Sequence, residues 1–295
     1  MTGLLVTGMT AMDLLMQVPD LPRAGVKYRA TDAALRLGGC AANAAVAAAR
    51  LGGQVRLVSR MGDDLLSGAA RAALGAEGID LSGLHVTPGA LMPVSSVPID
   101  SAGQRQVVNF RGAGLSETPD PASLSLDGIN AVLADTRWPE AGLAALAAAR
   151  SSGLPAVLDG EAPVPRAMAE AATHVAFARA GLAEFTGIDS PDRALEAAAA
   201  TLDATLIVTD GEAGLWWTDG RAVRHMPAFD VDVRDTLGAG DVWHGAFALA
   251  LGEGQPLDAA LRFASAAAAL KCMGTGGGSA APDRARTLQF LKDMT

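Results

Sequence analysis

The stretch that decides the fold of this chain is Asp235-Thr236-Leu237-Gly238-Ala239-Gly240-Asp241, which runs directly into Val242-Trp243-His244-Gly245-Ala246-Phe247-Ala248-Leu249. The second part is an apolar, helix-like run, and the glycines before it let bare backbone come close to a ligand. N–H groups at the start of a helix attract anions, and the positive end of the helix dipole strengthens that attraction. The sequence therefore predicts an anion site at residues 238 to 240.

A carboxylate follows this anion site immediately, because Asp241 lies at the start of the same helical run. The helix dipole keeps it ionised, but it would repel the anion unless its task is to take up a proton beside it. This combination indicates phosphoryl transfer to a hydroxyl group, in which the amides of Gly238, Ala239 and Gly240 hold the migrating group while Asp241 receives the proton. The alternative is an ordinary aspartate near a helix start. We assign His244, one turn further on, to packing or hydrogen bonding.

The segment from Asp235 to Asp241 resembles the DTxGAGD signature of the ribokinase-like (PfkB) carbohydrate kinases. A second signature of that family is Gly38-Gly39-Cys40-Ala41-Ala42-Asn43-Ala44-Ala45-Val46-Ala47-Ala48-Ala49-Arg50-Leu51-Gly52, near the other end of the chain. Two motifs in the right order are far more specific than one. The resemblance extends from Gly8 and Asp13 to Thr275-Gly276-Gly277-Gly278. It implies one ribokinase-like kinase domain over residues 1–295, with ATP and Mg2+ as cofactors.

Composition agrees with a single enzyme domain. The chain has 295 residues, half of them hydrophobic, which is enough for one large core. A net charge of −9 argues against binding to nucleic acid or to an anionic membrane. The N-terminal run Leu4 to Thr7 follows no basic region, no apolar stretch reaches the roughly 20 residues of a membrane span, and Cys40 and Cys272 make no disulfide framework. We expect a cytoplasmic protein.

Short apolar runs alternate along the chain with Ala-rich helical patterns. The predicted strands are Leu4 to Thr7, Val55 to Val58, Ala131 to Ala134, Ala156 to Leu158, His174 to Phe177 and Thr205 to Val208. The predicted helices cover residues 41–51, 65–77, 140–151, 192–202, 242–251, 257–272 and 284–293. This alternation predicts an α/β fold, a mostly parallel sheet with helices on both faces. Ligands then belong at the carboxyl ends of the strands.

One region departs from this alternation. Met92 to Ile99 and Arg105 to Phe110 have the pattern of two strands joined by the turn Ser101-Ala102-Gly103, and Val26 to Leu37 also looks extended. They predict a small sheet outside the core, formed by about residues 14–37 and 91–112. The resemblance implies that it is a lid over the sugar and that it pairs with its twin in a homodimer. A lid would keep water away from ATP. The alternative is a surface ribbon without function.

Sugar recognition needs polar groups at strand ends. Asp13 follows the first strand, and Asn43 opens a helix after Gly38 and Gly39, which allow close backbone approach. The resemblance implies that these four residues contact the sugar. The alternative is that Asp13 caps a turn and Asn43 merely starts a helix.

The resemblance places the nucleotide in the C-terminal third of the chain. The implied nucleotide-binding residues are Thr209, Gly211, Gly214, Gly238, Gly240, Gly276 and Gly277. The last two resemble the loop beside the adenine, although a glycine cluster can also end a helix.

The implied metal sites fit the sequence less well. The Asn-x-x-Glu that organises magnesium in many family members is replaced by Ala178-Arg179-Ala180-Gly181. Asp159 or Glu161, after the strand Ala156 to Leu158, are substitutes as magnesium ligands. Arg179 is instead a candidate for contact with a phosphate of the nucleotide. For a monovalent cation, K+, Asp235 is the one ligand that can be placed.

The positions of cationic side chains narrow the class of sugar that could accept the phosphoryl group. Arg137 precedes the helix start at Pro139, where a cation opposes the helix dipole, so we expect it to bind an anionic ligand. With Lys27, Asn109 and Arg111 from the predicted lid it would form a clamp for a sulfonate or phosphate. Solvated surface charges are the alternative.

The residues around Arg137 and Lys27 look most like those of the 6-deoxy-6-sulfofructose kinases. That likeness implies a ketohexose with an anion at C6, phosphorylated at its C1 hydroxyl. Fructose, fructose 6-phosphate and ribose remain alternative acceptors. A sugar-sensing protein with little catalysis is an alternative of another class, because the Asn-x-x-Glu pair is missing.

Overall fold

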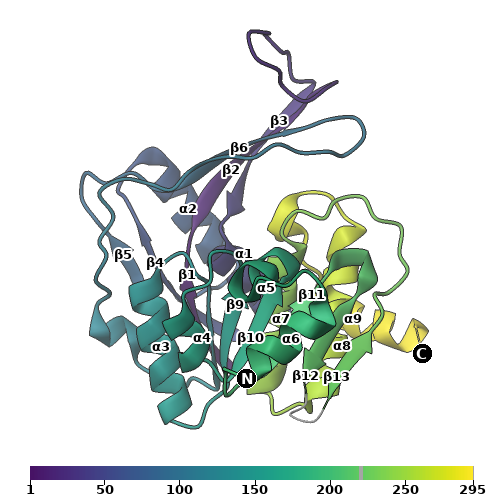
Figure 1. Cartoon of the computed structure of the whole chain (residues 1–295). Coiled ribbons are helices and arrows are strands. Elements are labelled where there is room, and N and C mark those ends of the chain that lie inside the picture. Colours follow the sequence, from purple (N-terminus) through teal and green to yellow (C-terminus); the bar gives the residue numbers. More distant parts are fainter. Residues whose placement is uncertain (219–221, 295) are drawn as a thin grey trace.

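Two β-sheets of unequal size organise the chain, as the computed structural model shows for residues 1–218 and 222–294, which are the ones it describes (Figure 1). The larger sheet has the strand order β13-β12-β11-β10-β9-β8-β1-β4-β5. Its strands are β1 (Gly3–Gly8), β4 (Gln54–Met61), β5 (Leu84–Val86), β8 (Ala131–Ala134), β9 (Ala156–Gly160), β10 (His174–Ala178), β11 (Thr205–Thr209), β12 (Leu215–Thr218) and β13 (Val223–Met226). All neighbours pair in parallel except β11 with β12 and β12 with β13.

Helices cover both faces of this sheet because neighbouring strand residues point to opposite sides. Leu4 and Val6 belong to a core with α1, α7 and α8, whereas Leu5 belongs to a core with α3, α4, α5 and α6. The helices are α1 (Cys40–Arg50), α2 (Leu65–Ala76), α3 (Pro139–Ser151), α4 (Arg166–Ala171), α5 (Arg179–Thr186), α6 (Pro191–Ala199), α7 (Ala239–Gly252), α8 (Leu257–Cys272) and α9 (Arg284–Asp293). Short 3-10 turns are η1 (Pro121–Leu124), η2 (Gly211–Ala213) and η3 (Gly277–Ala280). In the described chain, none of these helices combines the length and apolar character of a membrane span.

The predicted α/β fold is confirmed. All six predicted core strands and all seven predicted helices are present, with ends that differ by a few residues. The sequence patterns missed α4 and α5, which have six and eight residues and give little helical periodicity. They also missed β5 and β13, short strands at the two edges of the sheet.

The smaller sheet projects from the core and has the strand order β3-β2-β6-β7 (Figure 1). Its strands are β2 (Ala11–Gln17), β3 (Asp32–Gly38), β6 (Val94–Ile99) and β7 (Val108–Phe110). Three expectations need correction here. The sheet begins at Ala11, so Asp13 lies within a strand of it. The stretch Val26 to Leu37 is paired only from Asp32. The two later strands are shorter than predicted, because β6 begins at Val94 and because residues 100–107 form a long connection before β7.

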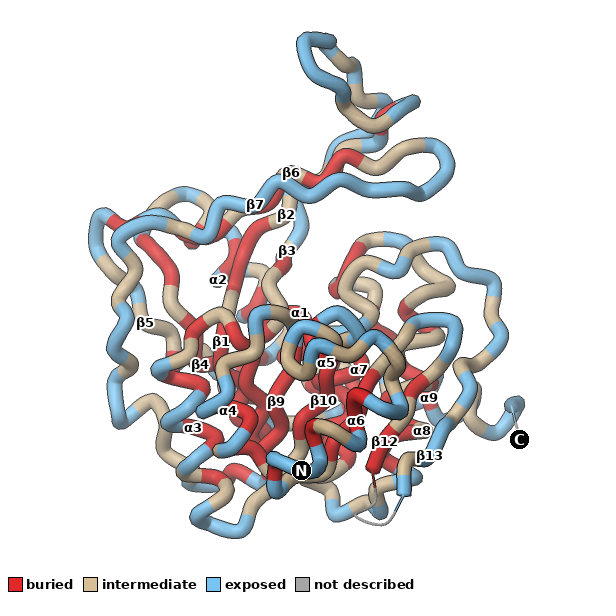
Figure 2. Tube along the Cα trace, in the orientation of Figure 1, coloured by how far each residue is buried: buried red, intermediate tan, exposed pale blue. Residues whose placement is uncertain are grey.

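The two faces of the smaller sheet differ in chemistry. Paired residues share a face, so the register places Arg36, Asp13, Ser95 and Asn109 in one row across all four strands. The opposite face carries Leu14, Leu35, Val108 and Phe110, whose exposed fractions lie between 37% and 63%. Figure 2 shows how much of the outer part of this sheet is open to solvent. One face is therefore polar and the other is apolar and uncovered in the single chain.

Candidate active site

Polar side chains gather where the strands of the large sheet end and α7 begins. Asp135 directly follows β8, Asp159 lies near the end of β9, and Asp241 is in the first turn of α7. Because all these strands run in parallel, their carboxyl ends meet at one edge of the sheet. Three carboxylates that are far apart in the sequence therefore share one neighbourhood.

The backbone before α7 has the geometry predicted for an anion site. Gly238 caps the helix in the left-handed region, with φ 76°, and a Cβ there would lie 2.7 Å from the backbone N of Gly278. Beside Gly240, by contrast, a Cβ would meet no atom within 4 Å. The first N–H groups of a helix have no acceptor within it. The N–H groups of Gly240 and Asp241 are thus available to a ligand that approaches through this open space.

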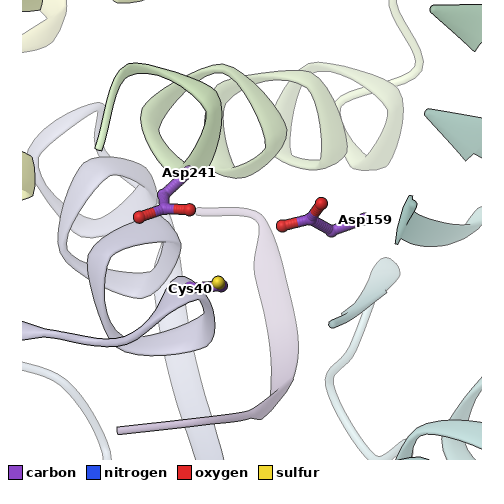
Figure 3. A group of neighbouring side chains, drawn as sticks. All are labelled: Cys40, Asp159 and Asp241. Carbon is purple, nitrogen blue, oxygen red and sulfur yellow. The ribbon is translucent and has the colours of Figure 1, made fainter. Parts of the chain in front are cut away.

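Asp241 lies among other acids and beside an amide. The Nδ2 of Asn43 donates a hydrogen bond of 2.7 Å to its Oδ2. Ligand atoms of Cys40, Asp159 and Asp241 all lie within 4.8 Å of one another, and Figure 3 shows the three side chains directed into the same space. Burial and the negative charge of Asp159 raise the pKa of Asp241 from 3.8 to about 7, although Asn43 opposes the shift. A carboxylate with this pKa is a stronger base than an ordinary aspartate.

Asp159 is itself in contact with a buried histidine. Burial, together with Glu161 and Asp135, raises the pKa of Asp159 well above its usual value. The Nε2 of His244 lies 3.0 Å from the carbonyl oxygen of Ala176, and its Nδ1 lies 3.6 Å from an oxygen of Asp159. Burial lowers the pKa of His244, so the ring is neutral at neutral pH. The packing and hydrogen-bonding role predicted for His244 is confirmed.

The predicted anion clamp is not assembled around Arg137. Its Nη2 forms an ion pair of 2.6 Å with Glu161, its Nη1 donates to the carbonyl oxygen of Ala162, and only 9% of the side chain is exposed. Lys27 and Arg111 are exposed and form no ion pair in the described chain, and Asn109 bonds to Ser95. Glu161, which directly follows β9, therefore neutralises the arginine in this structure.

The polar row of the smaller sheet brings together two of the predicted sugar residues. Asn109 donates a hydrogen bond of 3.1 Å to Ser95, and Ser95 is also hydrogen bonded to Asp13. Burial raises the pKa of Asp13, and the hydroxyl of Ser95 opposes that shift. Sequence reasoning missed Ser95 and Arg36, although the period of two residues along each strand would have placed both on the face of Asp13.

Sequence reasoning also missed Asp135. This buried carboxylate accepts N–H groups from Met9, Ala41 and Arg137 at distances of 2.8 to 3.0 Å. It therefore ties the end of β1 to the start of α1 and fixes the position of the second glycine motif. A lone aspartate directly after a buried apolar strand was the signal that pointed to it.

The predicted nucleotide loops lie at the same edge of the sheet. Thr209 ends β11, and its hydroxyl donates to the carbonyl oxygen of Phe177. Gly211 and Gly214 both have positive φ and bound the short turn η2. Arg179, the candidate for contact with a phosphate, forms an ion pair of 2.5 Å with Asp210 in this structure.

A second buried network lies at the other end of the motif, around Asp235. The N–H of Leu237 donates to its Oδ1, and those of Gly276 and Gly277 donate to its Oδ2. The ammonium of Lys271, which is fully buried, lies 2.6 Å from the carbonyl oxygen of Asp235 and 3.4 Å from its Oδ2. The glycines expected beside the adenine thus hold Asp235 in place.

The smaller sheet also touches this motif. The Nη1 of Arg105, in the connection between β6 and β7, donates a hydrogen bond of 2.8 Å to the hydroxyl of Thr236. Residues 100–107 therefore reach from the smaller sheet to the loop that precedes the anion site.

Comparison with known proteins identifies the family of the chain. A model of the family described as pfkB family carbohydrate kinase matches residues 1–284. A ribokinase of Bacillus subtilis (strain 168) is 31% identical over 295 residues, covering 99% of this chain and 100% of the relative.

Two solved structures are similar over their whole length. A provisionally assigned ribokinase from Agrobacterium tumefaciens has a TM-score of 0.93 at 36% identity, with 99% of this chain and 98% of that chain covered. The ribokinase of Arabidopsis thaliana, solved with ribose and ATP, has a TM-score of 0.88 at 25% identity, with 99% of each chain covered.

Proposed function

Because the chain belongs to the pfkB family of carbohydrate kinases, we propose that it transfers the γ-phosphoryl group of ATP to the primary hydroxyl of a small sugar, with Asp241 as the base. The observation that carries this proposal is the position of Asp241. It lies in the first turn of α7, beside the open space at Gly240. Within the described chain, its carboxylate accepts a hydrogen bond from an amide and forms no ion pair with a lysine or arginine. An aspartate placed there is available to receive a proton.

The proposed step balances as follows. The sugar hydroxyl loses its proton to the carboxylate of Asp241, its oxygen forms a bond to the γ-phosphorus, the bond from that phosphorus to the β,γ-bridging oxygen breaks, and ADP leaves. The N–H groups of Gly240 and Asp241, at the positive end of α7, stabilise negative charge on the phosphoryl oxygens. Asn43 fixes the orientation of the base through its hydrogen bond to Oδ2.

Magnesium would supply charge neutralisation on the nucleotide phosphates. The donor set for it is carboxylate oxygen, the ligand type that Mg2+ prefers. Asp159 offers an oxygen within 4.8 Å of one from Asp241, and Glu161 accepts a hydrogen bond from Cys40 of the same cluster. We propose these two residues as its protein ligands. In this structure Asp159 contacts His244 and Glu161 forms an ion pair with Arg137, so the metal ion would compete with these two side chains.

For the acceptor, we favour a neutral pentose or ketohexose such as ribose or fructose. The specific observation is that Glu161 already neutralises Arg137, which leaves the central arginine of the predicted clamp without free charge. A ketohexose with an anion at C6, such as 6-deoxy-6-sulfofructose, is the second candidate. Lys27 and Arg111 favour it, because each is exposed and without an ion pair in the described chain.

We propose that the smaller sheet is a lid, with its polar row of Asp13, Ser95 and Asn109 facing the sugar. The hydrogen bond from Arg105 to Thr236 links this lid to the phosphate end of the site. The apolar face with Leu14, Leu35 and Val108 suits contact with the same face of a second copy. Light scattering on the wild-type protein and on Leu35→Glu tests that dimer, which the charge should dissociate.

The experiment for the reaction is measurement of ADP formation with Mg-ATP and a panel of acceptors, namely ribose, fructose, fructose 6-phosphate and 6-deoxy-6-sulfofructose. A kcat/KM highest for ribose or fructose supports the favoured acceptor class. A clear preference for a C6-anionic sugar that is lost in Lys27→Met and Arg111→Met supports the second. Sugar binding by calorimetry without turnover of any sugar would support a sugar-sensing protein and contradict the kinase.

A further inference from the structure

The least expected charge in the molecule is the ammonium of Lys271. This residue lies in the last turn of α8 and is 0% exposed. Long charged side chains are rarely buried completely, because taking an ammonium out of water is costly unless acceptors replace the water. Its acceptors among the described residues are the carbonyl oxygen of Asp235 at 2.6 Å and, more distantly, Oδ2 of the same residue at 3.4 Å. A single residue therefore supplies both a dipole and a charge to the lysine.

The position of this ammonium matters because the sequence resemblance places a K+ ligand at Asp235. A site for K+ needs oxygen atoms that are free to turn toward the ion. Here the two carboxylate oxygens already accept N–H groups from Leu237, Gly276 and Gly277, and the carbonyl oxygen accepts from the lysine. The described residues do not fit a metal ion at Asp235, because a cation belonging to the protein already occupies that position.

We propose that the ammonium of Lys271 is a permanent internal cation in place of a monovalent metal ion, and that the protein works without K+. It neutralises Asp235, and the neutralised carboxylate gathers the loop before α7 and the loop at Gly276 and Gly277. A protein-borne cation does this without depending on the concentration of a dissolved ion, because it is covalently attached.

The network has a direct mechanical route to the anion site. Gly277 and Gly278 belong to η3, and a Cβ on Gly238 would lie 2.7 Å from the backbone N of Gly278. The amide of Leu237, bonded to Asp235, is one residue before Gly238. Any shift of Asp235 would therefore move the backbone that presents the N–H groups of Gly240 and Asp241. Lys271 is a positioning residue, since it acts through Asp235 and the loop rather than on the nucleotide.

The first test uses the wild-type protein. Its thermal midpoint and its dissociation constant for Mg-ATP are measured in KCl and in tetramethylammonium chloride of equal ionic strength, since the larger cation does not fit a site for K+. We expect the same midpoint in both salts and dissociation constants that agree within about twofold, because a ligand without a site shifts no equilibrium. A midpoint that rises with K+, or nucleotide binding strengthened about tenfold by it, would overturn the inference.

The second test removes the internal charge. Lys271→Met keeps an unbranched side chain, one atom shorter, and leaves Asp235 without its cation. Lys292→Met, on the exposed part of α9, is the matched control. We expect Lys271→Met to bind Mg-ATP about tenfold more weakly in tetramethylammonium chloride and to recover most of the loss in KCl, while Lys292→Met responds to neither salt. A folded Lys271→Met that ignores K+ in both thermal midpoint and nucleotide binding would contradict the proposal.

The double variant Lys271→Met/Asp235→Asn covers the case in which the single variant does not fold. It removes both buried charges together, which proteins tolerate better than the loss of one partner. We expect it to fold and to show no response to K+, because the anionic ligand is gone. A response to K+ in this variant would refute Asp235 as the ligand. The readout of nucleotide binding depends on the proposed kinase function, whereas the thermal midpoints do not. A wild-type protein that binds no nucleotide would therefore refute the function and leave the lysine inference to be judged by the midpoints.

Discussion

The two ends of the segment from Asp235 to Asp241 carry the same side chain in opposite environments. Burial alone would raise the pKa of Asp235, but the N–H groups of Gly277, Leu237 and Gly276 and the charge of Lys271 outweigh it, and the net shift is downward. At Asp241 burial acts in the same direction and more strongly, and the charge of Asp159 adds to it, so the pKa rises to about 7. Burial and the sign of the neighbouring charges together separate the two residues.

This difference divides the work between them. A carboxylate that is surrounded by donors and a cation is a fixed anion, which suits it to hold loops together. A carboxylate that is crowded by other acids takes up a proton readily, which suits it to act as a base near neutral pH. We therefore assign Asp235 a structural role and Asp241 a chemical one, and four kinds of measurement test that division.

The largest effect belongs to Asp241→Asn, which keeps the shape of the side chain and removes its basicity. We expect kcat to fall by about 10^3-fold, within the range of general-base contributions, with the dissociation constant for Mg-ATP nearly unchanged. Asp258→Asn is the matched control, because Asp258 is also in the first turn of its helix, α8, but is exposed. Full turnover in Asp241→Asn would show that Asp241 is not the base and that its role does not differ from that of Asp235 as proposed.

Next in size is the loss of stability in Asp235→Asn. The variant leaves the ammonium of Lys271 buried without its anion, and such unpaired charges cost on the order of 3 kcal/mol. We expect the urea midpoint at pH 7.5 to fall accordingly, with an unchanged slope. An unaltered midpoint would mean that the pair contributes nothing to folding.

Asp241→Asn should change stability in the opposite direction, and only at higher pH. The pKa of Asp241 in the folded protein is about 7, above the 3.8 of an ordinary aspartate, so the folded state holds this proton more tightly than the unfolded state does. Its contribution to stability is present below the unfolded pKa and is lost as the pH rises through about 7. We expect the apo variant to be more stable than wild type by about 1 kcal/mol at pH 8, a figure reduced for the partial exposure of Asp241, and equal to it near pH 4. Equal stability at both pH values would contradict the raised pKa.

The smallest effect concerns the amide that touches the base. The pH profile of kcat/KM should fall below an inflection near pH 7 in the wild type, because Asp241 must be unprotonated to accept a proton. Asn43→Ala removes a hydrogen bond that lowers the pKa of Asp241, so the inflection should move upward by less than about one pH unit. Asn109→Ala serves as the control, since this amide bonds to Ser95 and not to Asp241. It should raise KM for the sugar and leave the inflection in place, and equal shifts in both variants would point to a general loss of structure.

Much of the fold was predictable because it depends on patterns local to the chain. The strand of residues 131–134 was placed to the residue, and the helix after Gly238 was expected from two glycines and an apolar run. The smaller sheet was harder. Residues 11–17 alternate weakly, and one of their partners, β6, lies some distance along the chain. Asp13 was therefore placed after the core strand and not within a strand of the smaller sheet.

The sequence predicted which residues belong to the candidate site better than it predicted the contacts between them. Asn43 and Asp241 were both selected, but as members of different subsites, and the structure joins them by a hydrogen bond across 198 residues of sequence. Arg137 was selected because its charge had no partner in the sequence pattern, whereas in the structure Glu161 forms an ion pair with it. Cys40 belongs to one of the two signatures, yet only the fold brings it beside Asp159 and Asp241.

The sequence by itself determined the alternation of strands and helices, and it singled out the glycines before α7 and the candidate base Asp241, because periodicity, glycine content and helix starts are properties of neighbouring residues. Only the tertiary structure decided the charge environment of each acid. Lys271 reaches Asp235 from the far end of α8, and Asp159 reaches Asp241 from β9. Electrostatic interaction depends on distance and burial in space, so two aspartates six positions apart can differ in acidity for reasons that no local pattern records.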